Sequence, residues 1–231
     1  MRLLWQQIPS AMITELFCKH TDGVVLDLEH GCFNPETVYG CVQVAKLMER
    51  IVLIRFPEID SGRMRMCLDA GADGIILSTV ECSAESDAFL TTCKYEYKRG
   101  QGLVRENLWG DLNLKMRRNS RDENVLLIPQ IETRLGVENI DDIVRDEFAY
   151  YMVGPYDLSA SYGHVGDFED YHFVDAMQTL REKLGNKLGY HIVKDVESQY
   201  EELKNCEFLA LGMDTLFLIE GAKMMRSICS Q

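Results

Sequence analysis

The sequence contains few basic residues and no long apolar run. Its 231 residues include 24 Lys and Arg against 37 Asp and Glu, which gives a formal net charge of −13 at pH 7. This balance argues against a nucleic-acid partner, because binding to a phosphate backbone requires a basic surface. No apolar stretch reaches the length that a membrane-spanning helix needs. We therefore expect neither a nucleic-acid partner nor a membrane partner.

The amino terminus also lacks the features of a secretion signal. Residues 1–9 (MRLLWQQIP) contain no long apolar core and no small-residue cleavage site. The eight cysteines form no Cys-x-x-Cys pair, so the sequence indicates neither a zinc knuckle nor a redox dithiol. Most of them lie within apolar segments, where a free thiol behaves as a small hydrophobic group. We expect a cytoplasmic protein with reduced cysteines.

Short apolar runs alternate with longer amphipathic stretches along the chain. The runs are rich in Val, Ile, Leu and Tyr, which is typical of parallel strands that are buried on both faces. No Gly-rich nucleotide turn follows the first run, and this disfavours an open doubly wound sheet, the main alternative. The pattern predicts an α/β protein, a closed (β/α)₈ TIM barrel, with a single domain over residues 1–231. The expected strands cover residues 2–8, 23–28, 51–56, 74–79, 125–131, 148–154, 188–192 and 207–212.

Helical patterns lie between the expected strands, at residues 35–50, 61–69 and 137–144. Pro35 suits the first position of a helix, and Asn34 suits its N-cap. Residues 95–120 interrupt the alternation after the fourth strand. This segment could form a loop and helix over the barrel mouth, or a contact with another subunit.

Polar side chains stand at the carboxyl ends of several expected strands. These ends converge on one face of a parallel barrel. Side chains alternate along a strand, so Asp27 and Glu29 share a face, as do Gln130 and Glu132. We therefore expect one site to which separate strands contribute Gln7, Asp27, Glu29, His30, Arg55, Gln130, Glu132, Asp157 and Asp214.

Glu132 and Asp157 are the candidate metal ligands. Each ends an aliphatic strand, where the structure alone does not require a charge. Two carboxylates, with water and substrate oxygens, satisfy the octahedral geometry that Mg²⁺ or Mn²⁺ prefers. Either residue could instead cap a helix, since both lie close to a possible helix start. Their occurrence together favours the metal site.

Arg55 and His30 are the candidate catalytic groups. Arg55 could form an internal salt bridge with Asp27 or Glu29, or it could polarise a substrate carbonyl oxygen. His30 lies in a strand-end loop close to acidic groups, a setting that suits an acid/base catalyst. His164 could line the same mouth. The remaining histidines are expected at surface or packing positions: His20, His172 and His191.

Other catalytic classes find no support in the sequence. It contains no HExxH zinc motif, no nucleophile elbow and no Ser-His-Asp order. No lysine falls within the apolar part of an expected strand, which disfavours a Schiff-base mechanism. The residues therefore favour metal-assisted acid/base chemistry.

Five motifs occur in an order that resembles one known family. They are Leu26-Asp27-Leu28-Glu29-His30-Gly31, Ile54-Arg55, Leu68-Asp69-Ala70-Gly71-Ala72, Gln130-Ile131-Glu132-Thr133 and Gly154-Pro155-Tyr156-Asp157-Leu158-Ser159-Ala160-Ser161. Together they are similar to the HpcH/HpaI aldolase and citrate lyase family, over residues 5–218. The resemblance implies a barrel whose last helix is exchanged between subunits, in homo-oligomers built from dimers, such as a hexamer. It also implies a metal-dependent class II aldolase that cleaves or forms a 4-hydroxy-2-oxoacid from pyruvate enolate and an aldehyde.

The resemblance implies a role for each residue that matches a motif. Glu132 and Asp157 would bind the divalent cation (Mg²⁺ or Mn²⁺, with Co²⁺ as a further option), which in turn holds pyruvate. Arg55 would contact the keto oxygen. His30 would act as the acid/base through water, and Asp27 would organise this region.

Further roles are implied at the edge of the site. Gln130 would support the substrate or the metal, and the backbone amides of Tyr156 and Asp157 would receive the substrate carboxylate. The family pattern pairs Asp69 with the catalytic histidine. Asp69 follows a helix, however, and so is expected towards the opposite barrel end. It either acts across a subunit interface or simply ends its helix.

The chain departs from the family pattern at three places. Tyr-Pro-Pro is replaced by Tyr95-Glu96-Tyr97, a proline is replaced within Leu77-Ser78-Thr79-Val80, and Tyr156 stands where relatives often have a small residue. These changes concern the aldehyde partner more than the enolate chemistry. Two alternative functions stay open. One is a lyase of acyl-CoA thioesters of the malyl-CoA or citryl-CoA type, for which Lys98, Arg99 and Arg105 are the basic candidates. The other is a non-catalytic barrel module.

Overall fold

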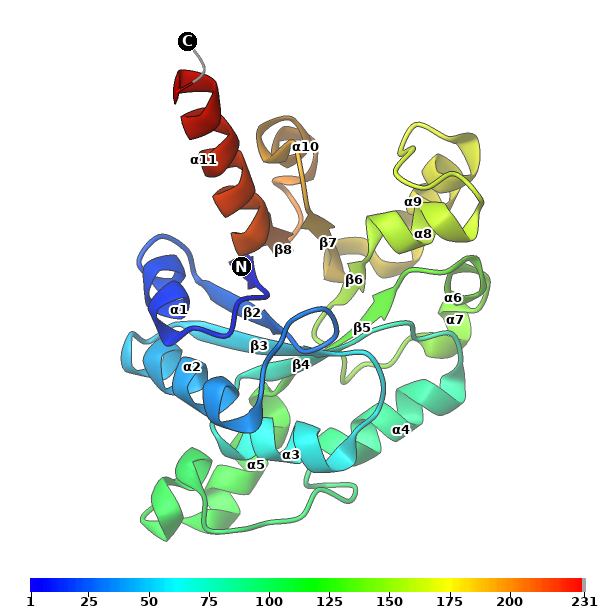
Figure 1. The fold of residues 1–231 in the computed structure, drawn as a ribbon. Coiled ribbons are helices and arrows are strands. Elements are labelled where there is room, and N and C mark those ends of the chain that lie inside the picture. The colour runs from blue at the N-terminus through cyan, green and yellow to red at the C-terminus, as the bar shows by residue number, and fades with distance from the viewer. Residues whose placement is uncertain (230–231) are drawn as a thin grey trace.

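The computed structural model describes residues 1–229, in which eight parallel strands close into a barrel (Figure 1). Each strand pairs with its neighbours in sequence, and β1 also pairs with β8. The predicted (β/α)₈ fold and all eight expected strands are confirmed, with ends that differ by a few residues. The strands are β1 (Arg2–Gln6), β2 (Gly23–Asp27), β3 (Ile51–Phe56), β4 (Gly74–Leu77), β5 (Leu126–Ile131), β6 (Tyr151–Val153), β7 (Leu188–Ile192) and β8 (Phe208–Leu211).

Helices lie between the successive strands and after β8. They are α1 (Ala11–Cys18), α2 (Pro35–Leu47), α3 (Ser61–Asp69), α4 (Ser83–Cys93), α5 (Leu114–Asn124), α6 (Arg134–Glu138), α7 (Ile140–Ile143), α8 (Pro155–Ser161), α9 (Tyr171–Leu184), α10 (Val196–Leu203) and α11 (Asp214–Cys229), with 3₁₀ segments η1 (Arg105–Gly110) and η2 (Gly185–Lys187). Among these helices, none is long and apolar enough to cross a bilayer.

The predicted helix starts can be compared with the structure directly. The Asn34 side chain accepts a hydrogen bond from the Thr37 amide, and Thr37 Oγ1 accepts one from the Asn34 amide, which completes a capping box at α2. Helix α3 has its predicted bounds. The single helix expected over residues 137–144 is wrong, because the chain leaves helical geometry at Asn139 and forms α6 and α7 instead.

Two apolar clusters pack against the strands, one outside the barrel and one inside it. The larger one fills the space between the barrel and its helices. The smaller one fills the barrel interior, with one inward side chain or more from seven of the strands: Leu3, Trp5, Val25, Leu53, Ile76, Ile128, Met152, Phe208 and Ala210. Because side chains alternate along a strand, the residue two positions after an interior residue also points inward, at the carboxyl end.

The segment between α4 and β5 lies at the amino ends of the strands. Arg105 Nη1 donates to the Ala70 carbonyl at 2.9 Å, and the Arg121 guanidinium donates to the Ala72 carbonyl; both carbonyls belong to the loop that precedes β4. In Figure 1 this segment, with α5, forms the lower end of the molecule. Of the two alternatives for this segment, the one that places it over the barrel mouth is therefore wrong, and a contact with another subunit stays a prediction. A segment between a helix and the next strand of a (β/α)₈ barrel lies at the amino end.

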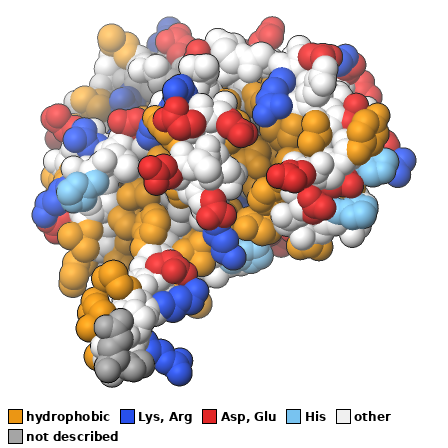
Figure 2. Space-filling view, turned by 90° about the horizontal axis from the view of Figure 1, so that it is seen from above, with side chains coloured by type: hydrophobic (Ala, Val, Ile, Leu, Met, Phe, Trp, Pro, Cys, Tyr) orange, Lys and Arg blue, Asp and Glu red, His pale blue; other side chains and the backbone are white. Residues whose placement is uncertain are grey.

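Helix α11 extends away from the barrel (Figure 1). Its large apolar side chains are exposed, among them Leu218 at 60% and Ile228 at 58% of their full accessible area. Figure 2 shows hydrophobic side chains along the arm that ends in the grey residues. An uncovered apolar helix of this kind is unusual in a folded monomer.

Candidate active site

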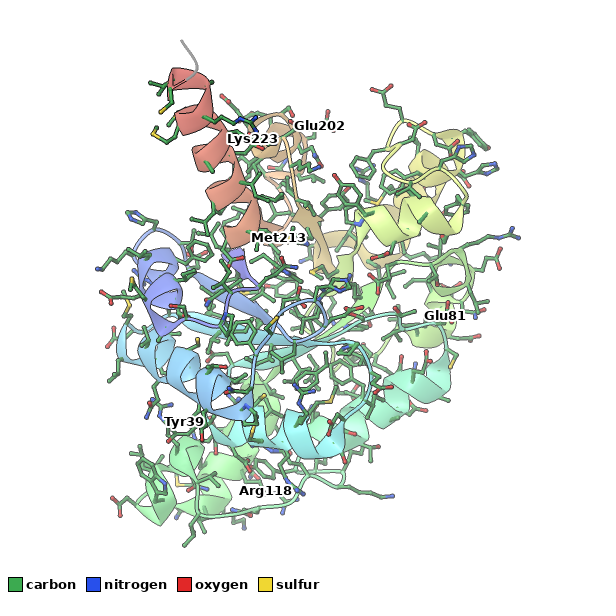
Figure 3. All side chains as sticks on the ribbon, in the orientation of Figure 1. Tyr39, Glu81, Arg118, Glu202, Met213 and Lys223 are labelled. Carbon is green, nitrogen blue, oxygen red and sulfur yellow. The ribbon has the colours of Figure 1, made fainter. Side chains whose placement is uncertain are left out.

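A cavity of about 270 Å³ opens at the carboxyl ends of the strands. The sequence predicts seven of its lining residues to belong to a site: Gln7, Asp27, His30, Arg55, Gln130, Tyr156 and Asp157. It also has Trp5, Gly154, Pro155, His191, Val193 and Met213 in its walls. Met213, labelled in Figure 3, lies at the base of α11.

Strand alternation accounts for three of the cavity side chains. Asp27, Arg55 and Gln130 each stand two residues beyond an interior residue of the same strand. The apolar layer therefore closes the barrel below them, and their polar groups form the floor of the cavity.

Asp27 and Arg55 form a buried ion pair. They are direct partners in the β2–β3 ladder, which places the two side chains next to each other. Arg55 Nε lies 2.9 Å from Asp27 Oδ1, and Arg55 Nη2 lies 2.8 Å from Oδ2. This bidentate geometry is the strongest form of arginine–carboxylate contact. The internal salt bridge considered from the sequence is thus present.

Other donors complete the hydrogen bonding of Asp27. Trp5 Nε1 donates to Oδ2 at 3.0 Å, and the backbone amides of Glu29 and His30 donate to Oδ1. Burial alone would raise the pKa of Asp27, but the hydrogen bonds and charge of Arg55 outweigh it and lower the pKa to about 2. Asp27 is therefore an anion that fixes both the arginine and the start of the His30 loop.

Arg55 also contacts Glu29. Arg55 Nη1 lies 2.8 Å from Glu29 Oε2, and Ser78 Oγ donates to the same oxygen at 2.6 Å. The His30 side chain is 60% exposed at the mouth, with Nε2 4.0 Å from Glu29 Oε1. A guanidinium has five N–H donors, and the contacts of Arg55 with Asp27 and Glu29 use three of them. Two remain for a substrate oxygen.

Glu132 lies directly behind the cavity wall, with 4% of its area exposed. Its Oε1 accepts hydrogen bonds from the Thr79 amide at 2.8 Å and from Thr79 Oγ1 at 2.7 Å. Its Oε2 accepts one from Gln130 Nε2. Gly154 permits this approach, because a Cβ there would overlap Glu132 Oε2 and Gln130 Nε2. Glu132 caps no helix: the N-cap of α6 is Thr133, whose side chain accepts from the Gly136 amide.

The surroundings of Glu132 fit a divalent cation. Burial, together with the negative charge of Asp157, raises the pKa of Glu132 to about 7, against the hydrogen bonds from Thr79 and the charge of Arg55. Gln130 Oε1 is buried with no hydrogen-bond partner in the described chain. Two carboxylates and an unpartnered amide oxygen are hard oxygen donors of the kind that Mg²⁺ binds.

The protein would contribute few ligands to such a cation. Among residues 1–229, no group of three or more His, Cys, Asp and Glu side chains converges on one point. Asp157, in the first turn of α8, is exposed, while Glu132 is buried. A site with one or two carboxylates is typical of Mg²⁺, which keeps several waters and takes further oxygens from the substrate.

Asp69 does not reach this cavity. Its carboxylate pairs with Arg99 at 2.7 Å, and it lines a separate surface pocket together with Tyr39 and Trp109. Figure 3 shows Tyr39 at the lower left of the molecule and Met213 near its centre, at the base of α11. Within one chain, Asp69 therefore lies apart from the other candidate catalytic residues.

Two further residues of the predicted site lie outside the cavity lining. Asp214 begins α11 and accepts hydrogen bonds from the backbone amides of Gln7 and Ile8, so it anchors the loop after β1. His164 lies outside the lining of the cavity, with Nε2 3.9 Å from Asp170 Oδ2. Its expected place at the mouth is wrong.

The sequence did not predict Trp5, Thr79 and His191 as site residues. His191 was expected at the surface or in packing; it is buried, but in the cavity wall. Its place in β7, two residues after Gly189, is the signal that strand alternation offers. Thr79 has a positive φ of 53°, which a β-branched residue rarely adopts and which no sequence pattern shows.

A closed parallel barrel with these charged groups at the carboxyl ends of its strands defines the chain as a (β/α)₈-barrel enzyme. The chain belongs to the HpcH/HpaI aldolase/citrate lyase family, whose model matches residues 4–220. This confirms the resemblance predicted from the motifs, and it places the chain in a family of carbon–carbon lyases.

Individual relatives support the assignment. A hydroxypyruvate/pyruvate aldolase of Roseovarius nubinhibens is 25% identical over 213 residues, which cover 87% of this chain and 81% of that protein. A 4-hydroxy-2-oxovalerate aldolase of Rhodococcus jostii is 28% identical over 220 residues, covering 91% and 83%. The crystal structure of an HpcH/HpaI aldolase from Desulfitobacterium hafniense superposes with a TM-score of 0.87 at 21% identity, covering 98% of this chain and 93% of that one. That likeness shows the shared fold.

Proposed function

We propose that the protein is a divalent-metal-dependent aldolase, which cleaves or forms a 4-hydroxy-2-oxoacid from pyruvate enolate and an aldehyde. The observation that carries this proposal is the buried Glu132 carboxylate beside Asp157 and the unpartnered Gln130 oxygen. Aldolase relatives support the reaction class. A bound Mg²⁺, Mn²⁺ or Co²⁺ would supply Lewis-acid polarisation of the oxoacid.

Each residue of the site has a task in this reaction. Glu132 and Asp157 hold the cation, and Gln130 supports it or the substrate. Arg55 directs its two remaining N–H donors at the keto oxygen, where negative charge grows as the enolate forms. The Asp27 pair keeps the guanidinium in place, since Asp27 binds it through both carboxylate oxygens.

The carboxylate end of the oxoacid requires donors at the other wall. The amides of Tyr156 and Asp157 lie in the first turn of α8, where backbone N–H groups have no partner within the helix. We assign the substrate carboxylate to them. His30, exposed at the mouth, takes the C4 hydroxyl proton during cleavage through a water molecule, and returns it in the reverse direction.

The acyl-CoA alternative has no comparable support. It requires basic side chains near the mouth for the CoA phosphates. Arg99 pairs with Asp69, and Arg105 binds the Ala70 carbonyl, both in the segment at the amino ends of the strands. These candidates therefore lie far from the cavity of their own chain.

The oligomer belongs to the same proposal. Helix α11 exposes Phe217, Leu218, Ile219, Met224, Met225 and Ile228 and extends away from its own barrel after its first turn. We propose that two copies exchange this helix within a dimer-based assembly, in which Asp69 could act at a partner's site. Leu218→Glu should convert the assembly to a smaller species in light scattering. An unchanged mass would contradict the exchange.

Exchange of the pyruvate methyl protons in deuterated water tests the enolate step without any aldehyde. The wild type should exchange them with added Mg²⁺ or Mn²⁺ and stop after chelation, followed by proton NMR. Glu132→Gln should lose most of this exchange, because the ion loses its buried ligand. Exchange that is equally fast in the chelated enzyme would overturn the proposed function.

A further inference from the structure

His191 presents an unusual polar group in the cavity wall. It lies in β7 opposite Ala210 of β8, and 8% of its area is exposed. Its ring stacks on Trp5, with centroids 4.2 Å apart and planes 19° apart. The Arg55 guanidinium lies over the same indole, 4.9 Å from the ring centroid. The ring orientation of His191 is therefore restricted by packing.

The hydrogen bond of His191 determines which nitrogen carries the proton. His191 Nε2 lies 3.2 Å from the Gly212 carbonyl oxygen. A carbonyl oxygen only accepts, so Nε2 must donate, and in the neutral ring Nδ1 is then an acceptor. Burial lowers the pKa of His191 to about 4, so the ring is neutral at pH 7.

Among residues 1–229, no donor contacts Nδ1, and Nδ1 is absent from the fully buried polar atoms that lack a partner, so it is accessible from the cavity. Two wall residues carry apolar side chains: Val193, two positions after His191, and Met213, which follows Gly212. Water can reach this acceptor in the free enzyme, but a bound substrate without a donor would displace the water and leave Nδ1 unpaired. A donor from the bound substrate would satisfy it.

We propose that His191 determines substrate specificity by accepting, at Nδ1, a hydrogen bond from a hydroxyl group of the substrate. This inference rests on the proposed aldolase function and deepens it. The hydroxyl group can come from C3 of the oxoacid or from C2 of the aldehyde. In either case the enzyme selects a hydroxylated substrate over the methyl analogue of the same size.

Two isosteric pairs distinguish the sources. 3-Hydroxypyruvate and 2-oxobutyrate differ by OH against CH₃ in the oxoacid, and glycolaldehyde and propanal differ in the same way in the aldehyde. The wild type should prefer the hydroxylated member of one pair by roughly tenfold or more in kcat/KM, because the methyl analogue leaves Nδ1 unpaired. His191→Leu should reduce this preference to about twofold or less and leave the other pair unchanged.

His191→Asn keeps an acceptor near the δ position and should restore part of the preference. His20→Leu changes an exposed histidine outside the cavity and serves as the matched control. Should His191→Leu fail to fold, the wild-type ratios and the Asn variant still decide the question. A wild type that discriminates in neither pair overturns the inference, as does a Leu variant that slows all four substrates equally.

The proposed function and this inference fail differently. An enzyme that shows neither metal-dependent proton exchange of pyruvate nor aldol product contradicts both. An enzyme that exchanges the protons and forms product, without any preference for hydroxylated substrates, contradicts the role of His191 alone.

Discussion

Replacing Asp27 by Asn removes one charge from the buried pair and preserves the shape of the side chain. The Arg55 guanidinium then loses its bidentate partner and keeps Glu29, 2.8 Å from Nη1. Removal of one partner from a buried pair costs about 3–5 kcal/mol. Because Glu29 still compensates part of the charge, we expect the free energy of unfolding to fall by about 3 kcal/mol at pH 7.

The pH dependence of this effect has a definite sign. The pKa of Asp27 is about 2, below its ordinary value of 3.8. A lowered folded-state pKa stabilises the fold above the unfolded-state value, and the contribution disappears as the pH falls through the folded-state value. The contribution is about 2 kcal/mol at pH 7, of which about 1 kcal/mol is lost by pH 3. The difference in the free energy of unfolding between wild type and variant should therefore narrow by about 1 kcal/mol between pH 7 and pH 3.

Urea unfolding at fixed protein concentration measures the gap. The chain has two tryptophans, and Trp109 is 61% exposed, so a Trp109→Phe background leaves the buried Trp5 as the reporter. Trp5 Nε1 donates to Asp27, so its emission reports on the pair directly. A gap that stays constant between pH 7 and pH 3 would refute the pKa and the bidentate pair as its cause.

Three further predictions concern the surroundings of the site. Thr79→Val removes the hydroxyl donor to Glu132 and should lower Mn²⁺ affinity roughly tenfold or more, whereas Thr79→Ser should keep the wild-type affinity. Calorimetric titration measures both affinities, and equal values in the two variants would contradict the contact. Gly154→Ala places a Cβ against Glu132 and Gln130, so both Tm and metal affinity should fall, and an unchanged Tm in calorimetry would argue against this packing. Burial lowers the pKa of His191 to about 4, so the wild type should lose about 2 kcal/mol of unfolding free energy between pH 7 and pH 5. His191→Phe should not show this loss in urea unfolding. Equal losses in both proteins would contradict a buried neutral ring.

Much of the site could be predicted because a parallel barrel obeys a simple rule. Apolar runs identify the strands, and alternation then places Asp27, Arg55 and Gln130 on the inner face at the carboxyl ends. The ladder register makes Asp27 and Arg55 neighbours. The residues themselves could not decide between a salt bridge and a substrate contact for Arg55, because the choice depends on how many donors remain unused.

The errors also have physical causes. The segment after α4 was considered for the mouth, although a helix of this fold returns the chain to the amino ends of the strands. The prediction of a surface or packing position for His191 misses the cavity wall, because a single histidine in an apolar strand offers no sign of its hydrogen-bond partner. Thr79 depends on a left-handed backbone conformation, which the sequence does not encode locally.

Titration with Mn²⁺, followed by electron paramagnetic resonance with and without pyruvate, tests the paired carboxylates most directly. The wild type should bind one Mn²⁺ per chain, and pyruvate should alter the spectrum of the bound ion. Glu132→Gln should bind Mn²⁺ at least about tenfold more weakly, since it loses an inner ligand. Equal affinity in wild type and variant, with a spectrum that pyruvate leaves unchanged, would contradict the proposed metal site.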